Sequence, residues 1–145
     1  MKISFEIPGK PGSKARPRIS RYTKQAYTPQ KTLNYENLVK YIFITEHKDF
    51  KPFENSVKAK ITAIFEVPKS YSKKKRTELL NWNYGYPHKP DTDNIAKIVL
   101  DSLNGLAYKD DAQITKLEVE KSYGEQAKVI VELEEICEGG NKWKY

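Results

Sequence analysis

Apolar and polar residues alternate along four segments of the chain, which is the pattern of a strand that buries one face. These segments are residues 2–7, 56–68, 112–122 and 127–135. The second is the clearest, and Pro68 ends it because proline cannot donate to a strand ladder. The last two are joined around Gly124, so we expect them to form a β-hairpin.

Three other segments favour helices. They are residues 30–48, Ser72 to about Trp82, and Asp91 or Asp93 to about Asn104. The first and third carry apolar residues along one face. Ser72 is a suitable N-cap for the second, and Gly105 is a suitable C-cap for the third.

The predicted order is strand, helix, strand, short helix, helix and two strands, with a long loop rich in proline and glycine at residues 8–30. This order indicates an α+β fold, with a mixed or antiparallel sheet packed against two to three helices. We expect a single small domain over residues 1–138. Residues 139–145 are expected to form a loosely ordered tail.

Composition narrows the possible partners and location. The chain has 145 residues, 38% of them apolar, and a formal net charge of +7. A basic balance favours nucleic acid, an anionic membrane or another acidic partner. No apolar run approaches the roughly 20 residues of a membrane span, and the first residues lack a signal peptide's apolar stretch, so we expect a cytoplasmic protein. A single cysteine, Cys137, excludes an intrachain disulfide and a Cys-rich zinc site.

Two clusters of carboxylates interrupt this basic chain, at Asp91-Thr92-Asp93-Asn94 and at Asp110-Asp111. Acidic side chains held close together repel each other, and a hard divalent cation such as Mg²⁺ would offset that repulsion. An Asp-x-Asp pair alone is weak support, because Asp93 could simply cap a helix. An acidic metal site in a basic protein would fit an enzyme that acts on a polyanion.

Helical spacing extends the first cluster. Asp93, Lys97 and Asp101 are spaced i, i+4 and i+8, so they share one stripe of a helix. Lys97 would then meet a phosphate beside the metal and stabilise its charge. The alternative is a solvated helix face that carries ordinary ion pairs.

The second cluster follows the glycine-terminated helix, so a short turn would return it toward that helix. The alternative is an ordinary polar turn. Asn94 and Gln113 flank the two clusters and would hydrogen-bond the metal-binding acids, unless they are simply polar surface residues. Three or four carboxylates would suit metal-assisted phosphodiester cleavage, in which the cation activates water and stabilises the developing charge.

Three segments closely resemble the RusA family of Holliday-junction resolvases (crossover junction endodeoxyribonucleases). They are Lys89-Pro90-Asp91-Thr92-Asp93-Asn94-Ile95-Ala96-Lys97, Leu100-Asp101-Ser102-Leu103-Asn104 and Lys109-Asp110-Asp111-Ala112-Gln113. They match that family's P-D-x-D-N-x-x-K helix start, D-x-L-N/T segment and D-D-x-Q turn, in this order. The opening Phe5-Glu6-Ile7-Pro8-Gly9-Lys10-Pro11 is similar as well, whereas the basic loop at 9–28 falls where members of the family vary.

The resemblance implies a Mg²⁺-dependent endonuclease, with Mn²⁺ as a possible substitute, that cuts four-way DNA junctions as a homodimer in DNA recombination and repair. Carried over by position, Asp91, Asp93 and Asp111 would be the metal-binding catalytic acids. Lys97 would be the catalytic lysine. Asp110 matches a residue beside the site whose role is less certain.

The long loop carries six basic residues and no acid, so we expect it to contact DNA phosphates. The six are Lys10, Lys14, Arg16, Arg18, Arg21 and Lys24. The alternative is a mobile, solvated loop. His88 could bind metal or act as a base, although a lone loop histidine usually does neither. Trp82, Tyr84 and Tyr86 would either stack on bases or pack beneath the loop.

Two other functions stay open. Nucleotidyltransferases also use an Asp-x-Asp pair, but they place a Gly-Ser helix start shortly before it, and here Gly12-Ser13 lies far upstream. A non-catalytic DNA-binding module would use the same acids only to hold a structural ion.

Overall fold

The computed structural model of the chain describes residues 1–81 and 85–136. The main sheet has four strands, β1 (Lys2–Pro8), β4 (Val57–Glu66), β5 (Ile114–Gly124) and β6 (Lys128–Glu135). A separate two-stranded ladder consists of β2 (Arg18–Ile19) and β3 (Ala26–Tyr27). The helices are α1 (Gln30–Glu46), α2 (Lys73–Asn81) and α3 (Thr92–Ser102), and a 3₁₀ turn, η1, spans Asp111–Gln113. This is the single small α+β domain that the sequence predicts.

The strand order of the main sheet is β1-β6-β4-β5, with β4 parallel to β5 and antiparallel to β6. The predicted hairpin of the last two strands is therefore wrong, because β4 lies between them. The last residue of β5, Gly124, lies beside β4, where a Cβ atom would clash with the side chain of Ile64. Glycine is needed there because the two strands approach closely. From the sequence alone, the same glycine predicts a hairpin turn.

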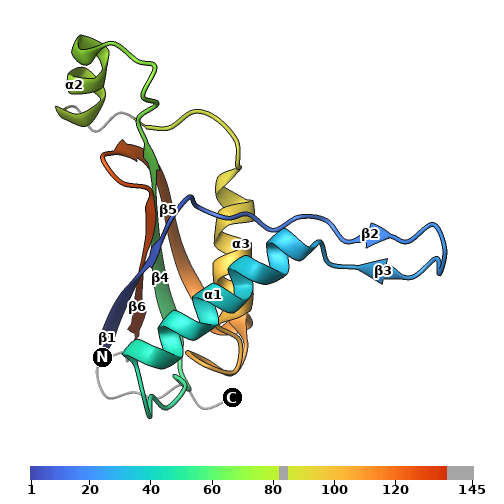
Figure 1. The fold of residues 1–145 in the computed structure, drawn as a ribbon. Helices are drawn as coiled ribbons and strands as arrows, with labels where there is room; N and C mark the ends of the chain where they lie inside the picture. The colour runs from blue at the N-terminus through green and yellow to red at the C-terminus, as the bar shows by residue number, and fades with distance from the viewer. Residues whose placement is uncertain (82–84, 137–145) are drawn as a thin grey trace.

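One face of the main sheet packs against α1 and α3 (Figure 1). The alternation seen in the sequence produces this face, because every second residue of β1, β4 and β6 is buried. The central strand β4 contributes the largest set, which is Val57, Ala59, Ile61, Ala63 and Phe65. Fully burying a valine, isoleucine or phenylalanine side chain is worth about 1.5–3 kcal/mol. The core thus anchors α3, which carries Asp93 and Asp101.

The helices keep their predicted apolar faces with small shifts of the ends. In α1, Val39 and Phe43 are buried and Leu38 and Ile42 pack against the core, while Leu33 stays 38% exposed. In α3, Ile95, Ile98 and Val99 are buried. Ser72 caps α2, since its Oγ accepts the N–H of Lys75 at 3.2 Å. Gly105 has φ +79°, which suits a glycine after a helix end.

The loop predicted at residues 8–30 has two parts. Its first part packs on the body: Pro11 is buried, and the N–H of Lys14 donates to the carbonyl of Asn94 at 3.0 Å. Gly12 lies against the ring of Tyr35, where a Cβ atom would clash. Its second part contains β2 and β3, which project from the body (Figure 1). Trp82, Tyr84, Cys137 and the tail at 139–145 lie outside the described residues.

Candidate active site

The first acid cluster stands at the start of α3. Asp91 is the N-cap residue with extended backbone, but its side chain accepts no capping hydrogen bond. Its carboxylate is 56% exposed, and its Oδ1 lies 3.9 Å from Nζ of Lys89. Asp93 and Lys97 are exposed on the same helix. Within residues 1–81 and 85–136 the side chains of Asp93 and Lys97 have no hydrogen bond or ion pair, so these polar groups are available to a ligand.

Lys121 on β5 holds the segment that leads into this cluster. Its Nζ donates to the carbonyl of His88 at 2.6 Å and to that of Pro90 at 2.9 Å. Tyr86, in the same segment, stacks on Phe65 with ring centroids 3.8 Å apart and an interplanar angle of 5°. The His88 ring packs edge-on against Tyr86. The sequence gives no sign of this role for Lys121, because it lies far from the acids along the chain.

The second acid cluster is held by its own hydrogen bonds. Asp110 caps η1, and its carboxylate and the Gln113 side chain form a reciprocal capping box. Gln113 also donates through Nε2 to the carbonyls of Phe53 and Asn55, at 2.8 and 3.1 Å. The N–H of Asp111 donates to Oδ1 of Asn104 at 2.9 Å. Gln113, predicted to support metal-binding acids, thus ties this turn to the segment before β4.

Negative charge is concentrated around Asp111. A hydrogen bond with Asp110, then burial, then the carboxylate of Asp101 raise the pKa of Asp111 to about 6. The hydrogen bond from Asp111 lowers the pKa of Asp110, and the N–H of Ala112 acts in the same direction. Burial, and then the charges of the three acids, also raise the pKa of Tyr108, whose hydroxyl donates to the carbonyl of Leu100 at 2.5 Å.

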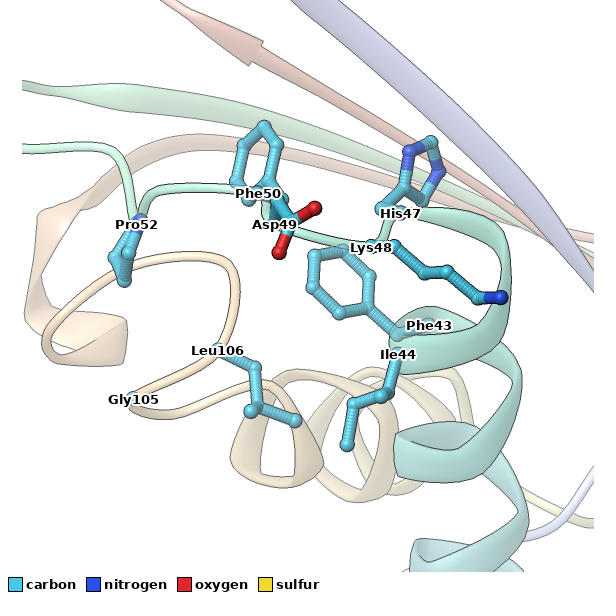
Figure 2. A pocket seen from close by; sticks show the side chains of 9 residues that line it. All are labelled: Phe43, Ile44, His47, Lys48, Asp49, Phe50, Pro52, Gly105 and Leu106. Atoms are coloured by element: carbon cyan, nitrogen blue, oxygen red, sulfur yellow. The ribbon is translucent and has the colours of Figure 1, made fainter.

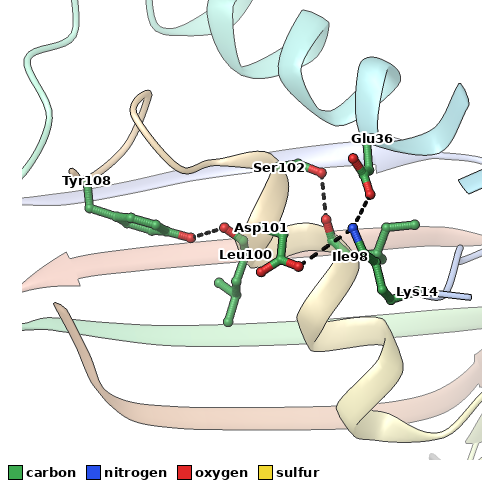
Figure 3. A network of polar contacts seen from close by, with 7 residues as sticks. All are labelled: Lys14, Glu36, Ile98, Leu100, Asp101, Ser102 and Tyr108. Atoms are coloured by element: carbon green, nitrogen blue, oxygen red, sulfur yellow. Dashed lines mark hydrogen bonds and ion pairs between the residues drawn. The ribbon is translucent and has the colours of Figure 1, made fainter. Parts of the chain in front are cut away.

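Lys14 links this acidic region to α1 (Figure 3). Its Nζ lies 2.5 Å from Oε1 of Glu36 and 3.7 Å from Oδ2 of Asp101. The side chain of Lys14 is only 23% exposed. The structure therefore places Lys14 in an ion-pair network, whereas the sequence predicts a DNA contact. The other five predicted DNA-binding residues are exposed: Lys10, Arg16, Arg18, Arg21 and Lys24.

The two acid clusters lie at opposite ends of α3. Asp111 interacts with Asp101, in the last turn of that helix, whereas Asp91 and Asp93 lie at its start. At 1.5 Å per residue, Asp93 and Asp101 are about 12 Å apart along the helix axis. Among the described residues, no three His, Cys, Asp or Glu side chains are arranged to hold one metal ion.

The chemistry of these groups nevertheless fits a hard cation. All the candidate ligands are carboxylates, which Mg²⁺ prefers. The raised pKa of Asp111 shows that its ionised form is disfavoured where it stands. A divalent cation would reverse this preference, because positive charge favours the ionised carboxylate. The donor set is therefore suitable, but one chain in this conformation supplies it in two parts.

A pocket of about 390 Å³ lies between the end of α1 and the turn after α3 (Figure 2). Phe43, Phe50 and Leu106 are among its lining residues. None of the predicted metal-binding acids lines it, so it is separate from the candidate site. In the described residues, no helix is long and apolar enough to cross a membrane.

Comparison with known proteins bears directly on these residues. The family model described as Endodeoxyribonuclease RusA matches residues 8–134. Uncharacterized protein YqaN of Bacillus subtilis (strain 168) is 32% identical over 138 residues, which cover 92% of this chain and 96% of that protein. The range matched by the family model includes both acid clusters, Lys97 and the segment with β2 and β3.

Proposed function

The chain belongs to the RusA endodeoxyribonuclease family, and we propose that it is a Mg²⁺-dependent endonuclease that resolves four-way DNA junctions. The observation that carries this proposal is the exposed stripe of α3 on which Asp93 and Lys97 lack protein partners among the described residues. Asp91, Asp93 and Asp111 would hold the metal. Bound Mg²⁺ supplies activation of water and stabilises charge on the scissile phosphate. Lys97 would bind the same phosphate.

A homodimer fits this substrate. A four-way junction has near two-fold symmetry and needs two opposed cuts, which a two-fold dimer with two sites would provide. The positions of the acids also favour a dimer, because one chain holds Asp93 and Asp111 at opposite ends of α3 and cannot bring them to one metal ion in this conformation. A dimer that sets the start of α3 in one protomer against the Asp110-Asp111 turn of its partner would complete both sites.

Incubation of the protein with a labelled synthetic four-way junction and Mg²⁺ tests the function. We expect paired, symmetric nicks whose products can be ligated, and no cutting in EDTA. The matched control is the linear duplex formed from the same arm sequences. Tight junction binding without cutting in Mg²⁺ or Mn²⁺ would instead favour the non-catalytic DNA-binding module.

Mixing two inactive variants tests the shared site. Asp93→Asn and Asp111→Asn chains, unfolded and refolded together, should recover about a quarter of the wild-type cutting sites. About half of the dimers are then mixed, and in each mixed dimer one site keeps both native acids. Each variant refolded alone is the control. No recovery, with mixed dimers demonstrated by pulling down an affinity tag carried by only one of the two variants, would place each site within one chain.

Lys121→Met should slow junction cutting roughly tenfold to a hundredfold, the effect expected when a group that orients metal-binding acids is lost. The two carbonyl contacts that fix the segment before Asp91 would disappear, while the fold would persist because Lys121 lies on an edge strand. Single-turnover cutting and hydrogen exchange in residues 85–91 measure this effect.

The matched control for that variant is Lys128→Met. Lys128 is a partly exposed lysine on β6 that pairs with Glu6 at 3.3 Å. Equal cutting rates for the two variants would contradict a positioning role for Lys121. A slower rate without any change in exchange of residues 85–91 would contradict it as well.

A further inference from the structure

Residues 16–27, hereafter the arm, form a feature that the candidate site does not use. The arm projects away from the sheet and from α1 and α3 (Figure 1). Its two strands pair only with each other, through the register Arg18 with Tyr27 and Ile19 with Ala26. A ladder of this length is marginal by itself. No residue of the arm belongs to the hydrophobic core.

Hydrogen bonds shape the tip of the arm. The N–H of Ser20 donates to the carbonyl of Gln25, and the N–H of Lys24 donates to the carbonyl of Ser20, both at 3.0 Å. The Ser20 hydroxyl accepts the N–H groups of Tyr22 and Thr23 at 3.2 and 3.3 Å. Lys24 has φ +54°, which closes the turn. The tip is thus pre-organised and presents the Tyr22 side chain outward.

Three large apolar side chains of the arm are exposed to solvent. Tyr22 is 98% exposed, Ile19 71% and Tyr27 48%. Exposed aromatic and aliphatic side chains that gather in one place commonly mark a binding surface. Tyrosine at a rigid tip is also suited to stacking on a flat ring.

Charge decides which partner fits. No acidic residue occurs between Glu6 and Glu36, and the arm itself carries Arg16, Arg18, Arg21 and Lys24. Two such arms would repel each other, which disfavours contact between the arms of two copies. Basic side chains around an aromatic group match single-stranded or unpaired nucleic acid, in which phosphates lie beside accessible base faces.

Resting on the proposed function, we propose that the arm enters the branch point of the junction and that Tyr22 stacks there on an unpaired base. Linear duplex DNA hides its base faces in the stack, whereas a branch point can expose them. Arg18, Arg21 and Lys24 bind the phosphates on either side. The arm therefore provides selectivity for branched over linear DNA, while the acids near α3 perform the cut.

The experiment uses a four-way junction with 2-aminopurine at the branch point, in EDTA so that no cutting occurs. Fluorescence reports unstacking of that base, and titration gives the affinity for the junction and for linear duplex. The variants are Tyr22→Ala and Tyr22→Phe, which keeps the aromatic ring. The matched control is Tyr41→Ala, which removes a 68% exposed tyrosine from α1.

We expect Tyr22→Ala to abolish the fluorescence change and to lower junction affinity between about fivefold and about a hundredfold, with duplex affinity unchanged. Tyr22→Phe and Tyr41→Ala should match the wild type. The inference is overturned if Tyr22→Ala keeps the wild-type signal, if it weakens junction and duplex equally, or if it dissociates the dimer. The fluorescence and affinity measurements do not depend on cutting. Failure of the proposed function would be seen separately, as a junction that stays intact in the cutting assay with Mg²⁺.

Discussion

Asp93→Asn is expected to lower the rate of junction cutting by more than about a hundredfold, with the fold and junction binding retained. The loss of a group that only supports a metal ligand costs tenfold to a hundredfold, so loss of a ligand should cost more. Asp93 is exposed and has no protein partner among the described residues, so its carboxylate contributes little to packing. The effect should therefore fall on catalysis.

Single-turnover cutting in Mg²⁺ and binding in EDTA separate these two properties. Asp49→Asn is a matched control, because Asp49 is an exposed acid in the segment after α1 and has φ +62°, a conformation that asparagine tolerates. We expect that control to cut at the wild-type rate. Undiminished cutting by Asp93→Asn would refute the role of Asp93.

Asp111→Asn should raise the stability of the metal-free protein at neutral pH. The folded pKa of Asp111, about 6, lies above its ordinary value of 3.8. Between these values the folded chain binds more protons than the unfolded chain, so stability falls as pH rises from about 4 to about 6. Asparagine stays neutral and can still donate to Asp110, so the variant avoids this loss.

Thermal unfolding in EDTA at pH 4 and pH 7 measures the effect. The variant should melt higher than the wild type at pH 7, and the difference should shrink at pH 4. Added Mg²⁺ at a hundredfold excess over Kd should stabilise the wild type by about 2.7 kcal/mol and the variant by much less. Identical pH and Mg²⁺ responses in both proteins would contradict a metal-linked role for Asp111.

The elements could be predicted from local pattern, whereas their pairing could not. The alternation in β4 and the apolar face of α3 follow from adjacent residues, and both lie where they were expected. The order of β5 and β6 depends on β4, which is remote in sequence and pairs along both of its edges. The β2–β3 ladder is too short for any alternation to reveal it.

For the candidate site as well, the residues could be predicted from local motifs, whereas their placement could not. Its acids and Lys97 could be identified from spacing and family resemblance, because motifs are local. Their placement at the two ends of α3 depends on how the turn at Asn104 returns the chain, which spacing does not specify. Lys14, Glu36 and Asp101 come from three segments that are remote in sequence, and their ion pairs form only in the folded chain. The sequence therefore indicated only that Lys14 is basic.

If the proposed function is right, Asp93 and Asp111 serve one metal site. Calorimetric titration of Mg²⁺ into the wild type, Asp93→Asn, Asp111→Asn and the double variant tests it most directly, since a double-mutant cycle reports coupling between two groups. We predict that each single variant loses the same binding event and that the double variant binds no more weakly than either. Losses of binding free energy that add in the double variant would show two independent sites and contradict the claim.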